Sequence, residues 1–325
     1  MTEKTVPNDI SQSEPIDGIQ QSSLMTSQVI GIQDQTFNQK FWYVLRRWPI
    51  IPLVVLFVMV IAAVFAPLLS PTGPRDINLR GRAAPPVWQS EWYEANPKNE
   101  QIYLLGADHV GRDVLTRMLY GARISLMVAV ISLSVGVVIG SAVGLVAGYY
   151  GGWIDEFAMR AVDVWNALPF LLIAILAAVT FGQSVSIVMI LLALIAWAGG
   201  VRNVRAEVLT LKTRDYISLA RIVGASDFRI IMRHILPGVV NTIVVLATLR
   251  VGGLILAEAS LSFLGAGIPA ATPTWGNMIS EGREWLSTAW WIAVFPGIAI
   301  LLVVMSVNFL GDWLRDRWDP KLRQL

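Results

Sequence analysis

Residues 216–237 read Tyr-Ile-Ser-Leu-Ala-Arg-Ile-Val-Gly-Ala-Ser-Asp-Phe-Arg-Ile-Ile-Met-Arg-His-Ile-Leu-Pro and contain one amphipathic pattern twice, on either side of Gly224. Apolar residues recur at i, i+3, i+4 and i+7, which places each set on one helix face. The two sets are Tyr216, Leu219, Ala220 and Val223, and Phe228, Ile231, Met232 and Ile235. Gly224 suits a left-handed C-cap, Ser226 suits an N-cap, and Pro237 follows the last apolar position. The stretch therefore predicts a helix–turn–helix whose apolar faces could contact a partner.

Composition places this stretch in a membrane protein. The chain has 325 residues, of which 55% are hydrophobic and only 15% are charged, too apolar for a soluble domain of this size. Six stretches are long enough to cross a bilayer core of ~30 Å as helices. They are about 50–69, 124–150, 164–181, 184–201, 239–264 and 288–310. We therefore expect an all-α integral membrane fold with six transmembrane helices.

Basic residues set the expected orientation, because Lys and Arg favour cytoplasmic loops. The segment 202–237 carries seven of them against three acidic residues, and the C-terminal end adds four more. We expect residues 1–40 to form a disordered cytoplasmic tail and 41–69 an uncleaved first span. Residues 70–121 should form an extracytoplasmic loop, 122–310 a five-helix core that includes the cytoplasmic loop 202–237, and 311–325 a second cytoplasmic tail.

The segment 216–237 resembles the EAA loop of bacterial ABC-importer permeases, in which a Glu-Ala-Ala triplet is followed by Gly and then by Leu-Pro. Its sequence Gly-Ala-Ser…Arg-His-Ile-Leu-Pro is similar to that of the dipeptide/oligopeptide/nickel branch. Residues 105–126 resemble the C-type subunit of peptide permeases. The resemblance covers about 40–322. In one departure, Ser218-Leu219-Ala220 stands where the triplet belongs, so the acidic residue is missing. A hairpin lying on the membrane surface is the alternative interpretation of this segment.

The resemblance implies a type I ABC-importer permease of the bacterial inner membrane, with both termini in the cytoplasm. The implied partners are a related second permease, two cytoplasmic ATPase subunits, an extracytoplasmic substrate-binding protein and membrane lipid, and the implied cargo is di- or oligopeptides. The residues expected to couple the ATPases to the spans are Tyr216, Leu219, Ala220, Val223, Gly224, Ala225, Ser226, Ile231, Leu236 and Pro237.

The chain has no catalytic motif of its own. None of its five lysines follows a glycine, so it lacks the Gly-Lys-Ser/Thr loop that holds ATP phosphates, and ATP and Mg would be used by partner subunits. The net charge of +2 gives no argument for nucleic acid. His109 and Asp113 have i, i+4 spacing, but two histidines and no cysteine are a poor basis for a metal site, and we expect no metal or other cofactor. Asp113 could instead cap a short outer helix over 114–119.

A stripe of small residues marks the second predicted span. Ser132 is followed at every fourth position by Gly136, Gly140, Gly144 and Gly148, which lets another helix backbone approach closely. The stripe predicts a packing seam, inside the subunit or against a partner permease. General glycine enrichment of membrane helices is the other explanation.

Two charges lie inside the fifth predicted span, Arg250 near its middle and Glu258 towards its outer end. Each costs at least ~2.5–3.5 kcal/mol in lipid, so each should face a water-filled path or a partner. We name both as candidate path-lining residues, although a structural contact between subunits is an equal alternative for Arg250. The rival function is a secondary transporter or channel that uses Arg250 and Glu258. A non-transporting scaffold is a third possibility.

Overall fold

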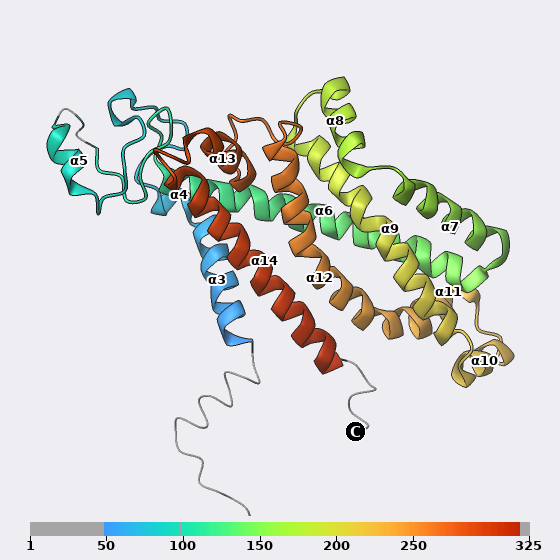
Figure 1. Ribbon diagram of the computed structural model, residues 1–325. Coiled ribbons are helices and arrows are strands. Elements are labelled where there is room, and N and C mark those ends of the chain that lie inside the picture. The colour runs from blue at the N-terminus through green and yellow to red at the C-terminus, as the bar shows by residue number, and fades with distance from the viewer. Residues whose placement is uncertain (1–48, 98, 100, 319–325) are drawn as a thin grey trace, which may run out of the picture. The chain divides into compact units, whose positions relative to one another are not determined.

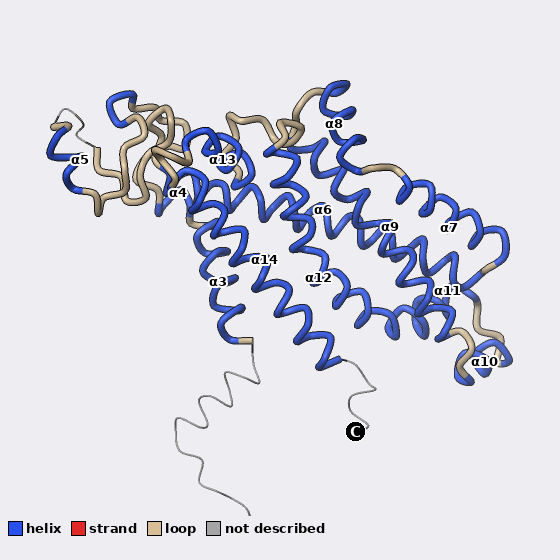
Figure 2. Tube along the Cα trace, in the orientation of Figure 1, coloured by secondary structure: helices blue, strands red, loops and turns tan. Residues whose placement is uncertain are grey.

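The computed structural model describes residues 49–318, apart from 98 and 100, and this part of the chain consists of helices and loops without a strand (Figures 1 and 2). The predicted tail 1–40 and the beginning of the predicted first span lie outside the described residues. So does the C-terminal end after Trp318, which closes the last helix.

Two long helices, α6 (Val114–Tyr150) and α9 (Val185–Leu211), lie side by side along most of their length (Figure 1). Asp113 caps α6, since its carboxylate accepts a hydrogen bond of 2.8 Å from the backbone N–H of Thr116. The expected short outer helix over 114–119 is therefore wrong as a separate element. Those residues form the first turns of α6, because nothing after the cap interrupts the helix before Gly151, whose φ is +68°.

The predicted third span, 164–181, is not one straight helix. The chain forms α7 (Gly152–Ala167) and α8 (Phe170–Phe181), which are bent by 80° relative to each other. Pro169 explains the break, because proline disfavours helical backbone in the preceding residue and lacks an N–H to continue the ladder. Leu168 is accordingly extended, with φ −85° and ψ 128°.

The second amphipathic helix does not end at Pro237 as predicted. A short helix α11 (Asp227–Ile230) continues through a π-helical segment, Ile231–Ile235, into α12 (Leu236–Phe263) without a break. The N–H of Leu236 bonds the carbonyl of Ile231, five residues back. This wider turn accommodates Pro237, whose ring would clash with the carbonyl four residues earlier in a regular α-helix.

The remaining spans pack around α12. The last helix, α14 (Trp291–Trp318), contacts α12 and the first described helix, α3 (Ile50–Val64), and it runs past the predicted boundary at 311. Among the described residues, four helical segments have the length and apolar character of a span: α6, α9, Asp227–Phe263 and α14. The α7–α8 pair would be a fifth. The expected span 50–69 is divided into α3 and α4 (Ala66–Leu69), and the 15 residues of α3 extend only ~22 Å.

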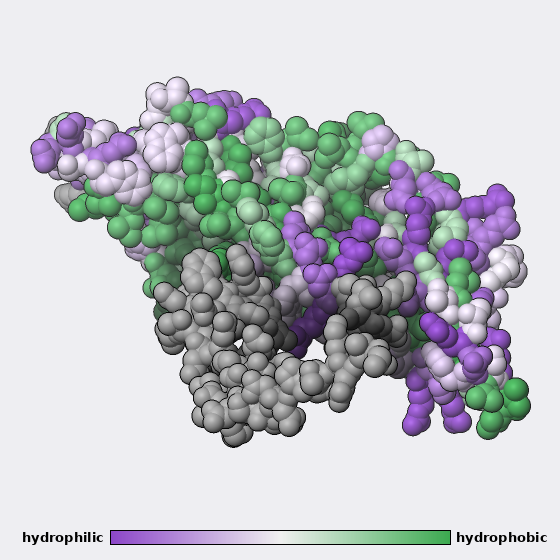
Figure 3. All heavy atoms as spheres, turned by 60° about the horizontal axis from the view of Figure 1, so that its bottom comes forward, coloured by the Kyte–Doolittle hydropathy of each residue, from purple (hydrophilic) through white to green (hydrophobic). Residues whose placement is uncertain are grey.

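Short elements mark the two ends of the helical body. One end carries η1 (Leu79–Gly81), α5 (Ser90–Ala95), α13 (Trp275–Gly282) and η3 (Arg283–Trp285). The other carries α10 (Asp215–Ile222), as Figure 1 shows. Hydrophobic side chains predominate between the ends, and hydrophilic ones gather around the α10 end (Figure 3). This distribution is the one that a bilayer-spanning body requires.

Candidate functional site

The turn between α10 and α11 has the capping geometry that its sequence predicts. Gly224 has φ +83°, the left-handed conformation that glycine adopts without strain. The N–H of Ala225 bonds the Ala220 carbonyl at 3.0 Å and the N–H of Gly224 bonds the Arg221 carbonyl at 2.9 Å, which is a Schellman motif. The hydroxyl of Ser226 accepts from the backbone N–H of Arg229 at 3.4 Å and begins α11.

The inner side of this helix pair is anchored to the membrane helices. Ile217, Ile230 and Ile235 are fully buried and pack with residues from the C-terminal ends of α6 and α9. The hydroxyl of Tyr149, at the end of α6, donates to the Asp227 carboxylate at 2.6 Å. The sequence pattern did not predict the burial of Ile217. Helix α10 is apolar on two sides, and the i, i+3, i+4 pattern that begins at Tyr216 describes only the side that does not include Ile217.

The outer side of the pair exposes a cluster of large apolar side chains. This docking patch consists of Tyr216, Leu219, Ile222, Val223 and Phe228. Ile222 is 81% exposed and Val223 85% exposed, so both face away from the body of the chain. Contiguous exposed apolar groups with a polar rim are typical of protein contact sites. Of the predicted coupling residues, Ile231 is instead buried, and Leu236 and Pro237 belong to the first turn of α12.

The glycine stripe of α6 faces α9 within the same chain. A Cβ at Gly136 would lie 2.5 Å from the carbonyl oxygen of Ala193, and a Cβ at Gly144 would lie 2.7 Å from that of Val201. A Cβ at Gly140 would overlap the carbonyl oxygen of Trp197, and a Cβ at Gly148 would lie 2.8 Å from the Cβ of Val208. The backbones of the two helices therefore approach at a distance that no side chain on this stripe would allow.

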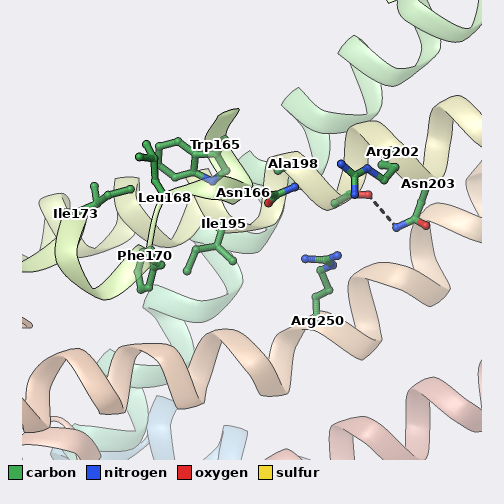
Figure 4. Close-up of a pocket in the computed structure, with 11 residues that line it drawn as sticks. Trp165, Asn166, Leu168, Phe170, Ile173, Ile195, Ala198, Arg202, Asn203 and Arg250 are labelled. Carbon is green, nitrogen blue, oxygen red and sulfur yellow. Dashed lines mark hydrogen bonds between the residues drawn. The ribbon is translucent and has the colours of Figure 1, made fainter. Parts of the chain in front are cut away.

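The two intramembrane charges occupy different surroundings. Glu258 is completely buried; its carboxylate accepts from the hydroxyls of Ser125 on α6, at 3.2 Å, and Ser262, at 2.8 Å. It therefore lies in the packed interior, contrary to the expectation that it lines a path. Arg250 lines a cavity of about 310 Å³ beside the α7–α8 break, shown in Figure 4. The structure does not bring Arg250 and Glu258 together.

A compact ionic network closes the opposite end of the molecule. Asp108 is fully buried and accepts from Arg112 at 2.6 Å and Arg117 at 2.7 Å, and Arg117 also donates to Glu281 on α13 at 2.6 Å. Burial acts to raise the pKa of Asp108, but the two guanidinium groups outweigh it and lower the pKa below its ordinary value of 3.8. Sequence reasoning missed this cluster, because Glu281 lies far along the chain and no local spacing connects it to Asp108.

Three residues at this network have the arrangement of possible metal ligands. Asp108, His109 and Glu281 could each direct one ligand atom to a common point, with those atoms within 4.8 Å of one another. Arg112 and Arg117 bind the same carboxylate oxygens, however, so the negative charge that a cation would need is already compensated. Asp113, the predicted companion of His109, serves as the cap of α6.

Comparison with known proteins supplies the family. A family model described as "Binding-protein-dependent transport system inner membrane component" matches residues 136–324. The chain is 44% identical over 228 residues to the glutathione transport system permease protein GsiD of Pectobacterium atrosepticum, covering 70% of this chain and 76% of the relative. It is 35% identical to the dipeptide transport system permease protein DppC of Haemophilus influenzae, covering 88% of this chain and 95% of the relative.

A solved structure agrees with the fold. The MetNI methionine ABC transporter in inward-facing conformations aligns with a TM-score of 0.50 and 21% identity, over 60% of this chain and 93% of that chain. At this identity the similarity concerns the arrangement of helices alone. The family match and the two relatives identify the chain as a member of the binding-protein-dependent transport system inner membrane component family.

Proposed function

We propose that this chain is a permease subunit of an ATP-driven importer of short peptides and that the docking patch receives an ATPase subunit. The names of the dipeptide and glutathione permease relatives support the substrate class. The observation that carries the docking role is the exposed apolar patch on a helix pair that is anchored on its inner side. An apolar surface of this kind loses unfavourable contact with water when a partner covers it.

In this proposal, movement of the docking patch is transmitted to the membrane helices through few elements. Phe228 lies on α11, which continues through the π segment into α12, so a push on the patch moves α12 directly. Packed helices transmit such a push as rigid bodies rather than absorbing it. ATP binding would close two ATPase subunits, shift the α10–α11 pair, and alternate the access of a path that this chain forms with a second permease. A binding protein would deliver peptide at the end that carries α5 and α13.

The orientation belongs to the same proposal. Seven basic residues in 202–237 favour the cytoplasmic side for the α10 end, where an ATPase would dock. Both termini would then be cytoplasmic, and the chain would be a non-catalytic membrane subunit that leaves ATP and Mg to its partners.

The test uses the left-handed position of the turn. A Cβ at Gly224 meets no atom within 4 Å, so a substitution acts through backbone conformation alone. Gly224→Val should strain the turn, because β-branched residues avoid positive φ, and lower ATP-driven uptake by about tenfold. Gly224→Asn is the matched control, since asparagine tolerates this conformation. Co-purification of the ATPase is measured on the purified complex, and uptake is measured in proteoliposomes made from that complex.

Two outcomes would contradict the proposal. Full uptake by Gly224→Val with a stably bound ATPase would remove the coupling role from this turn. Uptake driven by an ion gradient without ATP would favour the rival secondary transporter, in which Arg250 and Glu258 would be the working charges.

A further inference from the structure

The cavity beside the α7–α8 break has two chemically different ends. Figure 4 shows apolar and aromatic side chains at one end and polar side chains at the other. The first group is Trp165, Leu168, Phe170, Ile173 and Ile195; the second is Asn166, Arg202, Asn203 and Arg250. A site for an amphiphilic ligand is built in this way, with an apolar wall and a few polar groups that fix orientation.

Arg250 carries the uncompensated charge of this cavity. Arg202 is paired with Asp163 at 2.5 Å, and the side-chain amide of Asn203 donates to the Gly199 carbonyl at 2.8 Å. Within the described part of the chain, by contrast, no hydrogen bond or ion pair engages the Arg250 guanidinium, and no acidic residue lines the cavity. Arg250 also lies near the middle of α12, where a lone charge is costly in a membrane.

Gly199 leaves room for this charge against α9. A Cβ built at Gly199 would overlap the guanidinium of Arg250, so only glycine allows the group to rest against α9. The guanidinium therefore lies at the polar end of the cavity, in the space that a side chain at 199 would fill, with its donors free. Placing a charged group in advance of binding reduces the entropy that a ligand must overcome.

We propose that Arg250, resting on Gly199, binds the terminal carboxylate of a short peptide during transport. Guanidinium and carboxylate match as a two-bond fork, and the apolar end of the cavity would receive the adjoining side chain. A volume of about 310 Å³ is at the small end for ligand sites, which suits the C-terminal residue of a peptide rather than a long peptide as a whole. This inference rests on the proposed function and adds to it a recognition element in the membrane.

The first test compares alanyl-alanine with its C-terminal amide. Uptake of each is measured in proteoliposomes containing the full complex with its binding protein, for the native chain, Arg250→Gln, and Arg250→Lys. Because the binding protein is the same throughout, its own preference cancels in the ratio of acid to amide uptake between variants. Arg250→Gln should lower that ratio by about tenfold or more, and Arg250→Lys should lower it less, since the charge remains but the fork is lost.

Arg160→Gln is the control. Arg160 is exposed and paired with Glu156 on α7, outside the cavity, so its loss should leave the ratio unchanged. Equal loss of acid and amide uptake in Arg250→Gln would overturn the inference and assign Arg250 to assembly. An unchanged ratio would overturn it as well. If the native complex transports neither peptide, it is the proposed function that fails.

A second measurement does not depend on changing Arg250. The native chain has no cysteine, and Asn166 is exposed at the polar end of the cavity, so Asn166→Cys offers a single reactive thiol. Alanyl-alanine should slow the reaction of this thiol with a small water-soluble reagent in the purified complex, and the amide should slow it much less. Gly199→Ala should abolish the difference by displacing the guanidinium. Equal protection by acid and amide would overturn the inference.

Discussion

At the scale of single residues, the buried Asp108 determines how the outer network responds to substitution. Its carboxylate accepts from Arg112 and Arg117, and removing its charge leaves Arg117 buried with Glu281 as its remaining acidic partner. Asp108→Asn should therefore destabilise the protein by about 3–5 kcal/mol, as breaking a buried pair does. The measurement is thermal unfolding in detergent. Glu284→Gln is the control, since its ion pair with Arg283 is exposed and should change stability by less than about 1 kcal/mol.

The lowered pKa of Asp108 gives the same network a pH dependence of known sign. A carboxylate whose pKa is lower in the folded protein adds stability above its unfolded value, near 3.8, and loses it as the pH falls through the folded value. The native protein should thus lose stability on acidification below about pH 4, and Asp108→Asn should lose less over the same interval. Parallel stability curves for the two proteins between pH 6 and pH 3 would contradict the assignment.

Individual residues also show where sequence reasoning stopped. The cap at Asp113 and the left-handed Gly224 were predictable because each depends on neighbours within a few residues. The surroundings of Glu258 were not, since its partner Ser125 lies on another helix and no spacing joins them. A charge within an apolar stretch indicates only that some partner exists, and the fold decides which.

At the scale of elements, the α6–α9 pair gives the most direct test of packing. Gly140 faces the carbonyl of Trp197, whereas Val138 is 68% exposed on the other side of the same helix. Gly140→Leu should force the helices apart and cost several kcal/mol, lowering the yield of assembled protein, because a bulky side chain cannot fit against a backbone. Val138→Leu adds a methylene at an exposed site and should be tolerated. Equal yields on size-exclusion chromatography would show that the stripe does not hold the two helices together.

Two prolines in similar sequence surroundings have different effects on the helices that contain or precede them. Pro169 and Pro237 both follow a leucine, yet the first accompanies a bend of 80° and the second lies in the opening turn of a long helix. The difference is the π segment before Pro237, which shifts the hydrogen bonds by one residue and lets the helix continue. Local sequence predicts that a proline perturbs a helix, but both prolines follow a leucine, so the residue before the proline does not decide between a break and a π segment.

At the scale of the whole molecule, the bent α7–α8 pair decides the topology. Its two ends lie near opposite ends of the helical body. Gly151 adjoins Lys212 at the α10 end, where Lys212 also donates to the carbonyl of Gly148 at 2.9 Å. Beyond α8, Gln183 donates to the carbonyl of Gly265, in the loop that follows α12. The pair therefore connects the two ends of the body, although it bends on the way, which is the course that the third predicted span would take.

Cysteine labelling can test this crossing, because the native chain has no cysteine to remove. Glu156→Cys and Thr213→Cys place exposed thiols at the α10 end, and Gln183→Cys and Ser287→Cys place them at the opposite end. If the α7–α8 pair is a span, a membrane-impermeant thiol reagent should label the second pair of variants from outside intact spheroplasts. The first pair should react only in inverted vesicles, as the basic residues of 202–237 predict. Labelling of residue 183 from the same side as residue 156 would instead make α7–α8 a re-entrant hairpin. In that case α6 and α9 would have to cross the bilayer in opposite directions. The packed pair is parallel, because Gly136 faces Ala193, Gly140 faces Trp197 and Gly144 faces Val201, and only a crossing by α7–α8 lets two parallel helices both be spans.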